Sequence, residues 1–301
     1  CRVRTKGMPH DEYENCRLCP RMCGADRTKG RGYCGAPDST RVAKVMLHMW
    51  EEPCISGSAG SGAVFFSGCN LRCSYCQNRD ISFVTRGDAP TDEQLAEIFL
   101  SLQKRGAHNI DLITATPYLP SVISALKLAR PKLTVPVVYN TSGYESEDAV
   151  RALSPYVDVW LPDFKYASSA LAAKYSHAAD YPAVAYAAIS LMARLAGPPV
   201  FGDGMIKRGV IVRHLVLPGH RDDSAEAVRK IASLGRGNVL LSLMRQYTPQ
   251  FAGDDCDLKR RVTTFEYESV LEVARVAGLN GYCQSAQSAT SAYTPDFSQK
   301  D

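Results

Sequence analysis

The chain has 301 residues, of which 45% are hydrophobic and 22% are charged, and its formal net charge is +4. This composition is typical of a globular protein with enough apolar side chain for a sizeable core, and it excludes disordered and fibrous classes. Because a nucleic-acid-binding protein of this size usually carries a broad basic face, we expect no nucleic-acid partner.

Residues 1–37 form a segment rich in Cys, Arg and Gly, which we predict to be an appended metal-binding module. Its spacing is CxxCxxxC, then ten residues and a fourth thiol: Cys16, Cys19, Cys23 and Cys34. Four thiols can close a metal site, and cysteines this near in sequence seldom reach disulfide geometry. The spacing leaves two identities open for this site, structural zinc and an auxiliary [4Fe-4S] cluster.

The N-terminal segment also carries the positive excess of the chain. Residues 1–34 contain eight Lys and Arg against four Asp and Glu. These basic side chains either offset the negative charge of bound thiolates or form a docking patch for an acidic protein. The sequence supports both interpretations.

The cysteines also indicate the compartment. Seven of the eleven fall into two tight clusters, which suits metal ligation in a reducing environment, so we expect a cytoplasmic protein. The longest apolar stretch, 182–201, is interrupted by Arg194 and ends in Gly197, Pro198 and Pro199. It predicts a buried helix, and we expect no membrane association.

From Ala63 onward, short β-branched or aromatic runs alternate with helix-length amphipathic stretches. This pattern predicts an α/β fold, a partial (β/α)6 TIM-like barrel over 38–301 with a C-terminal extension. The predicted strands are 63–67, 110–114, 135–139, 157–161, 210–217 and 239–243. The predicted helices lie near 92–105, 120–129, 146–153, 223–234 and 266–277, with further helix inside 169–195. Thr91 and Gln94 have the spacing of a capping box at the first of these helices.

A second cysteine cluster follows the first predicted barrel strand directly. Cys69, Cys73 and Cys76 have the spacing CxxxCxxC, behind Gly68. Three thiolates on one loop can hold three irons of a cubane cluster, whereas a closed site needs four ligands. The fourth iron is left open for a small molecule to chelate, at the end of the strand where barrel enzymes keep their chemistry.

This loop resembles the signature of the radical S-adenosylmethionine (SAM) superfamily. The resemblance implies that a reduced [4Fe-4S] cluster on these three cysteines cleaves SAM to methionine and a 5′-deoxyadenosyl radical, which abstracts a substrate hydrogen. It also implies that Tyr75 lies near the adenine of SAM, that the enzyme is an oxygen-sensitive oxidoreductase, and that a reducing electron donor of flavodoxin or ferredoxin type is needed.

The chain is most similar to pyruvate formate-lyase activating enzymes and their uncharacterised relatives. Asn140-Thr141-Ser142-Gly143 and Leu161-Pro162-Asp163-Phe164-Lys165 resemble two family segments that follow the third and fourth strands. The resemblance implies that Thr141, Asp163 and Lys165 lie beside the methionine part of SAM. It further implies that Arg213 contacts the SAM carboxylate.

One segment departs from the family pattern. The activating enzymes commonly have Gly-Gly-Glu after the second strand, but this chain has Thr114-Ala115-Thr116-Pro117-Tyr118 there. With no carboxylate in that segment, Thr116 becomes a candidate to accept the SAM ammonium hydrogens.

Three functions are therefore weighed. The first is activation of a glycyl-radical enzyme, a protein substrate, by removing a backbone hydrogen. The second is radical modification of a small molecule or peptide. The third is a non-catalytic metal-binding interaction module, which the retained Arg213, Asp163 and loop cysteines disfavour.

Overall fold

The structure, a computed structural model, describes residues 11–252, 255–288 and 295–297. Residues 1–10 of the predicted N-terminal module and 298–301 of the predicted C-terminal extension lie outside the described residues, as do 253–254 and 289–294.

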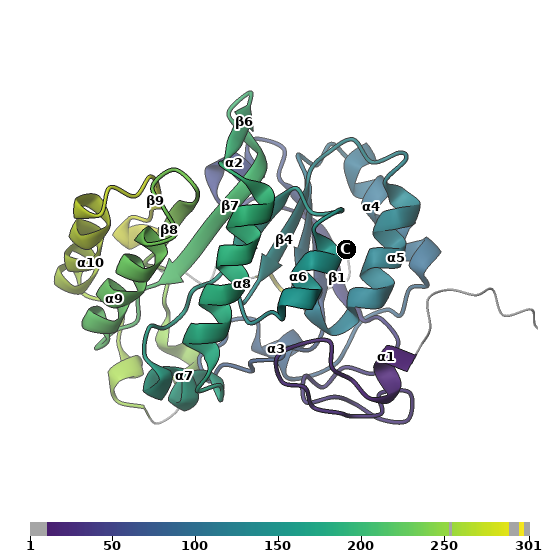
Figure 1. The fold of residues 1–301 in the computed structure, drawn as a ribbon, viewed down its shortest axis with the longest axis horizontal. Coiled ribbons are helices and arrows are strands. Elements are labelled where there is room, and N and C mark those ends of the chain that lie inside the picture. Colours follow the sequence, from purple (N-terminus) through teal and green to yellow (C-terminus); the bar gives the residue numbers. More distant parts are fainter. Residues whose placement is uncertain (1–10, 253–254, 289–294, 298–301) are drawn as a thin grey trace, which may run out of the picture.

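Nine strands of the described chain form one sheet (Figure 1). Its order is β1-β2-β3-β4-β5-β7-β8-β9, with β6 paired to β7 beside this path. All neighbours from β2 to β9 are parallel, whereas β1 and β6 run antiparallel to their partners. The strands are β1 (Val42–His48), β2 (Ser61–Phe66), β3 (Ile110–Ile113), β4 (Val137–Thr141), β5 (Val159–Pro162), β6 (Val200–Gly202), β7 (Met205–Leu215), β8 (Leu240–Met244) and β9 (Gly281–Cys283).

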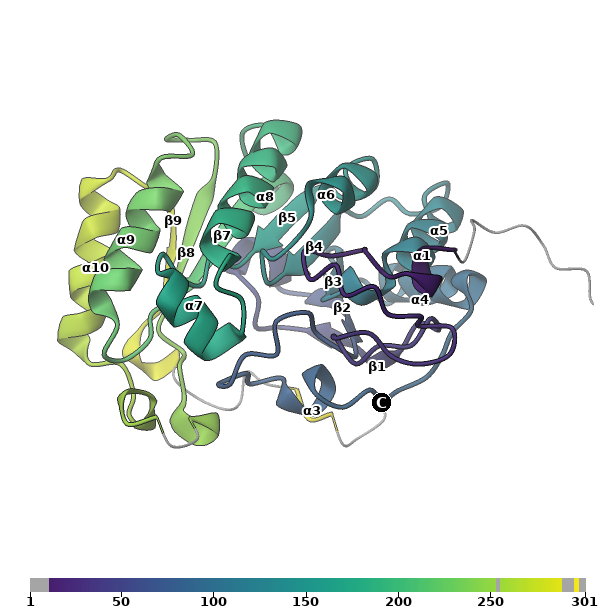
Figure 2. The same cartoon turned by 60° about the horizontal axis from the view of Figure 1, so that its bottom comes forward.

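The helices are α1 (Asp11–Glu14), α2 (Pro53–Ser56), α3 (Arg79–Ser82), α4 (Asp92–Lys104), α5 (Leu119–Ala129), α6 (Glu147–Leu153), α7 (Ser169–Ser176), α8 (Tyr181–Ala196), α9 (Arg221–Ala232) and α10 (Thr264–Val276). Of these, α4, α5, α6, α8, α9 and α10 lie between parallel strands in the chain and cover the outer face of the sheet (Figure 2). The mostly parallel sheet with its covering helices confirms the predicted α/β fold, a partial TIM-like barrel.

The six predicted barrel strands are confirmed as β2, β3, β4, β5, β7 and β8. The predicted capping box is also confirmed: Thr91 accepts from the Gln94 amide and its own amide donates to the Gln94 side chain. The structure also contains elements that the sequence pattern did not predict. The hairpin of β6 and β7 makes β7 longer than expected, and β9 adds a further parallel strand.

The core has two sides because the strands are buried on both faces. Side chains of β2 illustrate the alternation: Val64 and Phe66 belong to the large core under the helices, while Ala63 and Phe65 lie in a separate cluster. The short helix α2 inserts Cys54 and Ile55 into a third cluster with β4, β5 and β7. Figure 1 shows α2 at the amino-terminal end of these strands. It therefore helps to close that end of the barrel.

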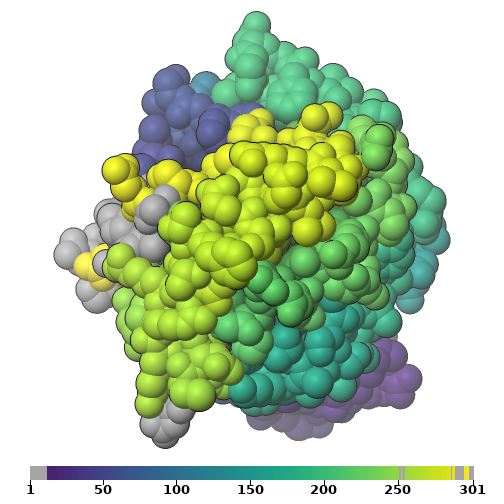
Figure 3. Space-filling model, turned by 90° about the vertical axis from the view of Figure 1, so that its left-hand side faces the viewer, coloured from purple at the N-terminus to yellow at the C-terminus, as the bar shows by residue number. Residues whose placement is uncertain are grey.

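The opposite, carboxyl-terminal end of the strands is covered by loops. Figure 1 shows α3, α7 and the purple N-terminal segment at this end. Figure 3 shows the C-terminal residues, in yellow, over the side of the molecule where α10 lies. Among the described residues, no helix combines the length and apolar character needed to cross a membrane.

Candidate functional site

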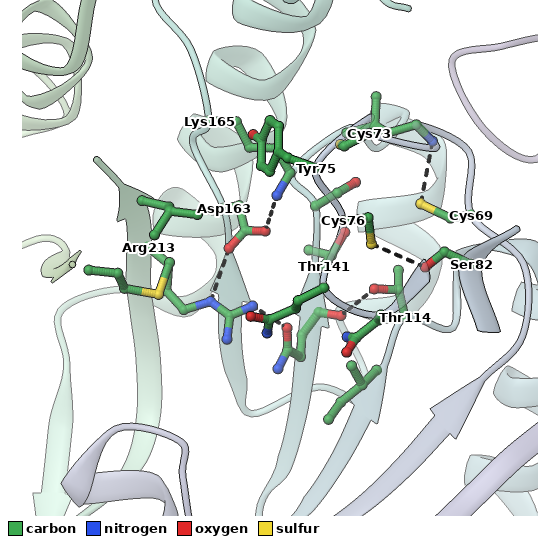
Figure 4. A pocket seen from close by; sticks show the side chains of 18 of the residues that line it. Cys69, Cys73, Tyr75, Cys76, Ser82, Thr114, Thr141, Asp163, Lys165 and Arg213 are labelled. Carbon is green, nitrogen blue, oxygen red and sulfur yellow. Dashed lines mark hydrogen bonds and ion pairs between the residues drawn. The ribbon is translucent and has the colours of Figure 1, made fainter. Parts of the chain in front are cut away.

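A cavity of about 210 Å³ opens at the carboxyl ends of the parallel strands. Loops after β2, β4, β5 and β8 contribute its lining, and β7 contributes Arg213. Figure 4 shows the loop cysteines along one side of the cavity and Arg213 with Asp163 on the other. Ligand sites of parallel α/β sheets lie at this edge because the successive loops converge there.

The segment between β2 and α3 carries Cys69, Cys73 and Cys76 and is called the cysteine loop below. Main-chain hydrogen bonds hold it in place. The amide of Cys69 donates to the carbonyl of Cys34 at 3.1 Å, and the amide of Gly68 donates to the carbonyl of Ile81 at 2.8 Å. Gly68 has φ +91°, and a Cβ there would lie 2.9 Å from the Cys34 carbonyl oxygen. Glycine is required here by both the backbone conformation and the close approach.

The three loop thiols face the cavity, and none is in a disulfide. Cys73 Sγ lies 2.9 Å from Ser176 Oγ, and Cys76 Sγ lies 3.5 Å from Ser82 Oγ. Within the described residues, these three sulfurs do not gather within 4.8 Å of one another. Sulfurs bound to one zinc ion would stand about 3.8 Å apart, given a Zn–S bond of about 2.3 Å. The set therefore fits a group larger than one ion, such as a cubane cluster.

A row of charged side chains lies across the cavity from the thiols. Arg213 Nε donates to Asp163 Oδ1 at 3.0 Å, and Lys165 Nζ donates to Asp163 Oδ2 at 2.6 Å. Burial alone would raise the pKa of Asp163, but Lys165 and Arg213 outweigh it and hold the pKa below its ordinary value. Asp163 is thus a carboxylate at neutral pH, and the two cations remain charged beside it.

Arg213 also joins segments that are distant in sequence. Its Nη1 donates to Glu51 Oε2 at 3.1 Å, and its Nη2 donates to Asn140 Oδ1. Glu51 lines the cavity beside His48, whose pKa is lowered to about 4 by burial and by Arg213. His48 is therefore neutral near pH 7. Our sequence reasoning missed Glu51 as a site residue; its only signal is a pair of carboxylates, Glu51 and Glu52, in an otherwise apolar turn.

Tyr75 contributes an aromatic wall to the cavity. Its ring makes edge contacts with Tyr175 and Tyr247, and its hydroxyl lies 2.6 Å from that of Tyr166. The hydroxyl of Tyr166 also lies 2.8 Å from Ser176 Oγ, and the same Ser176 oxygen contacts Cys73 Sγ. This chain of polar contacts fixes the face of the ring that a planar ligand would meet.

The structure brings Tyr75, Thr141, Asp163, Lys165 and Arg213 to the same cavity, but not Thr116. Thr116 lies in the 3-10 turn Thr116–Tyr118, and its buried hydroxyl donates to Glu145 Oε1 at 2.5 Å. The hydroxyl of Thr141 donates to the same oxygen at 2.5 Å. Thr116 is thus held away from the cavity, whereas Glu51 is a carboxyl group that lines it.

The N-terminal cysteines line a second, smaller cavity. Cys16, Cys19, Cys23 and Cys34 all face a space of about 10 Å³. Asn70, from the cysteine loop, lines the same space. The two sets of thiols therefore lie on either side of one stretch of backbone.

This arrangement is that of a radical SAM enzyme, and the chain belongs to the Radical SAM superfamily, whose sequence model matches residues 63–232. Membership implies a [4Fe-4S] cluster and SAM as cofactors, and the thiols, the charged row and the aromatic wall of the cavity fit both.

Three similar proteins illustrate the distance of these relationships. The uncharacterized protein MJ0674 of Methanocaldococcus jannaschii is 29% identical over 278 residues, which cover 89% of this chain and 76% of that protein. A radical SAM methyltransferase from Sphaerobacter thermophilus is similar in structure, with a TM-score of 0.52, 15% identity, and coverage of 74% of this chain and 66% of the other. Methylornithine synthase (PylB) is similar in structure, with a TM-score of 0.51 and 13% identity. The match covers 86% of this chain and 79% of the other. At these identities the structural likeness supports the fold alone.

Proposed function

We propose that this protein is an oxidoreductase that cleaves SAM reductively and removes a hydrogen atom from a substrate. The reduced cluster supplies the electron that splits SAM into methionine and a 5′-deoxyadenosyl radical, the species that takes the hydrogen. The observation that carries this proposal is a cavity lined both by three thiols of one loop and by a half-buried pair of cations around Asp163.

In this proposal the thiols on one side of the cavity bind the cluster, and the charged residues on the other side bind SAM. Cys69, Cys73 and Cys76 would hold the [4Fe-4S] cluster through three thiolates, and the site without a thiolate would be the one at which SAM binds. Lys165 still has ammonium hydrogens beyond its bond to Asp163, and it offers them to the SAM carboxylate. Arg213 already bonds Asp163, Glu51 and Asn140, so it acts by holding Asp163 in place and by its charge.

Two groups around SAM come from the remaining walls. Tyr75 offers a ring face to the adenine, while its hydroxyl remains paired with Tyr166. Glu51 provides a carboxylate for a cationic group, the role that we had assigned to Thr116.

Within the superfamily, we propose a place among the relatives of pyruvate formate-lyase activating enzymes. The segments around Thr141, Asp163-Phe164-Lys165 and Arg213 support this, and the Thr114–Tyr118 segment departs from it. The substrate we favour is the backbone of a glycyl-radical protein; a small molecule or another peptide is the second candidate. A one-electron donor of flavodoxin or ferredoxin type completes the reaction, and residues 1–37 form the metal-binding module.

Replacement of Cys73 tests the chemistry. In anaerobically purified protein given dithionite and SAM, we expect Cys73→Ala to reduce 5′-deoxyadenosine formation to background, since two thiols cannot hold the cluster with one open iron. Cys283→Ala is the matched control, because Cys283 is exposed on β9 and lies outside the cavity. Undiminished 5′-deoxyadenosine formation by Cys73→Ala would contradict the proposal.

Isotope transfer tests the substrate. A glycine-containing peptide or protein with deuterium on the glycine α-carbon should pass that deuterium into 5′-deoxyadenosine, detected by mass spectrometry. Deuterium transfer only from a small molecule, with none from glycine, would exclude the activating-enzyme function and support the second candidate.

A further inference from the structure

The four N-terminal cysteines are built as a site of their own. Cys16 is buried, Cys19 and Cys34 are half-buried, and Cys23 is exposed, and all four face one cavity.

A buried cation points to the same conclusion. Arg27 is 1% exposed, and its Nη1 lies 3.6 Å from Cys16 Sγ. The guanidinium also donates to the carbonyls of Ala36 and Pro37 and lies over the ring of Tyr13. A buried guanidinium requires negative charge nearby, and metal-bound thiolates supply it here.

The distances between the four sulfurs distinguish a site for a single metal ion from a site for an iron–sulfur cluster. Four sulfurs around zinc would stand about 3.8 Å apart and leave no space between them. Within the described part of the chain, no three of these four sulfurs lie within 4.8 Å of one another. In a cubane each sulfur binds a different iron, so wide spacing is expected, and the loop of Cys69, Cys73 and Cys76 has the same property.

The two thiol sets are joined by one hydrogen bond. The carbonyl of Cys34, on the N-terminal side, accepts from the amide of Cys69, on the cysteine loop, at 3.1 Å. Arg21 strengthens this junction: its Nε donates to the Asn70 carbonyl at 2.7 Å and its Nη2 to the Ser176 carbonyl at 3.0 Å. A path from sulfur to sulfur therefore runs through two residues and one main-chain hydrogen bond.

We propose that Cys16, Cys19, Cys23 and Cys34 bind a second [4Fe-4S] cluster, which passes single electrons through the Cys34–Cys69 hydrogen bond to the cluster of the cysteine loop. The relay rests on the proposed function. In each transfer the second cluster takes one electron from a ferredoxin- or flavodoxin-type protein and gives one to the loop cluster, and no bond is made or broken. Exposed Cys23, with exposed Arg17 and Arg31 near it in sequence, marks the side where the donor docks.

Metal analysis tests the site without relying on SAM cleavage. Wild-type protein, purified anaerobically, should contain about eight irons per chain and no stoichiometric zinc. The triple variant C69A/C73A/C76A should keep about four irons, four sulfides and the EPR signal of a reduced [4Fe-4S] cluster. One zinc per chain in the wild type, or a triple variant without iron, would overturn the site whatever the outcome for SAM.

A comparison of two reductants tests the relay. In C23A, we expect 5′-deoxyadenosine formation driven by a flavodoxin-type protein to fall roughly tenfold more than formation driven by dithionite, which reaches the loop cluster directly. C256A, at an exposed cysteine outside both cavities, is the control. Equal losses with the two reductants would overturn the relay and leave the iron count to decide the site.

Discussion

Glu145 connects the two cysteine sites at the level of single residues. The hydroxyls of Thr116 and Thr141 both donate to its Oε1, and Thr116 lines the small cavity while Thr141 lines the large one. Its second oxygen, Oε2, is buried and has no hydrogen-bond partner among the described residues. Burial therefore outweighs the hydroxyl donors and raises the pKa of Glu145 to about 7.

This raised pKa gives Glu145 a predictable effect on stability. Because protonated Glu145 is favoured in the folded state, its contribution is fully present below about pH 4.5 and is lost as the pH rises through about 7. The cost at pH 8 is about 3 kcal/mol. We expect Glu145→Gln, which stays neutral, to gain stability relative to the wild type between pH 5.5 and 8, measured by thermal unfolding of the anaerobic holoprotein.

The control for this experiment is Glu147→Gln, on the exposed start of α6. Its stability relative to the wild type should change little over the same pH range. If the difference between Glu145→Gln and the wild type were independent of pH, Glu145 would not be the buried, uncharged group described above.

At the scale of elements, the loop between β2 and α3 depends on Gly68. Its φ of +91° is costly for other residues, and an added Cβ would lie 2.9 Å from the backbone oxygen of Cys34, which cannot move alone. The N-terminal segment and the cysteine loop therefore fix each other.

Alanine at Gly68 should disturb both cysteine sites. We expect Gly68→Ala to destabilise the protein by about 3 kcal/mol and to lower the iron content of both sites. Gly106→Ala is a matched control, because Gly106 has φ +92° but no atom within 4 Å of an added Cβ, so it should lose only about 1 kcal/mol. Equal losses in thermal unfolding for the two variants would show that the contact with Cys34 has no effect.

The elements were predictable because their signals are local. Apolar runs predicted the barrel strands β2, β3, β4, β5, β7 and β8, and Thr91 with Gln94 predicted the start of α4. The cavity was predictable only in part. The spacing of Cys69, Cys73 and Cys76 is visible in the sequence, but Glu51 meets Arg213 across 162 residues, and no local pattern indicates that contact. The orientation of the Thr116 side chain likewise depends on its hydrogen bond to Glu145, 29 residues away.

At the scale of the whole molecule, all the proposed chemistry lies at one end of the barrel. The helix α2 helps to close the amino-terminal end, and the cysteine loop and N-terminal segment cover the other (Figure 1). Electrons are proposed to enter at exposed Cys23, and SAM to bind in the cavity between the loop thiols and the row of Asp163, Lys165 and Arg213.

The most direct test of this account is the EPR spectrum of the reduced, anaerobic protein before and after addition of SAM. Binding of SAM to an open iron changes the surroundings of that iron. We therefore predict that SAM alters the signal of the loop cluster, that the altered signal is lost in C69A/C73A/C76A, and that 5′-deoxyadenosine forms in the wild type. A reduced cluster whose spectrum is unchanged by saturating SAM, with no 5′-deoxyadenosine formed, would contradict the account.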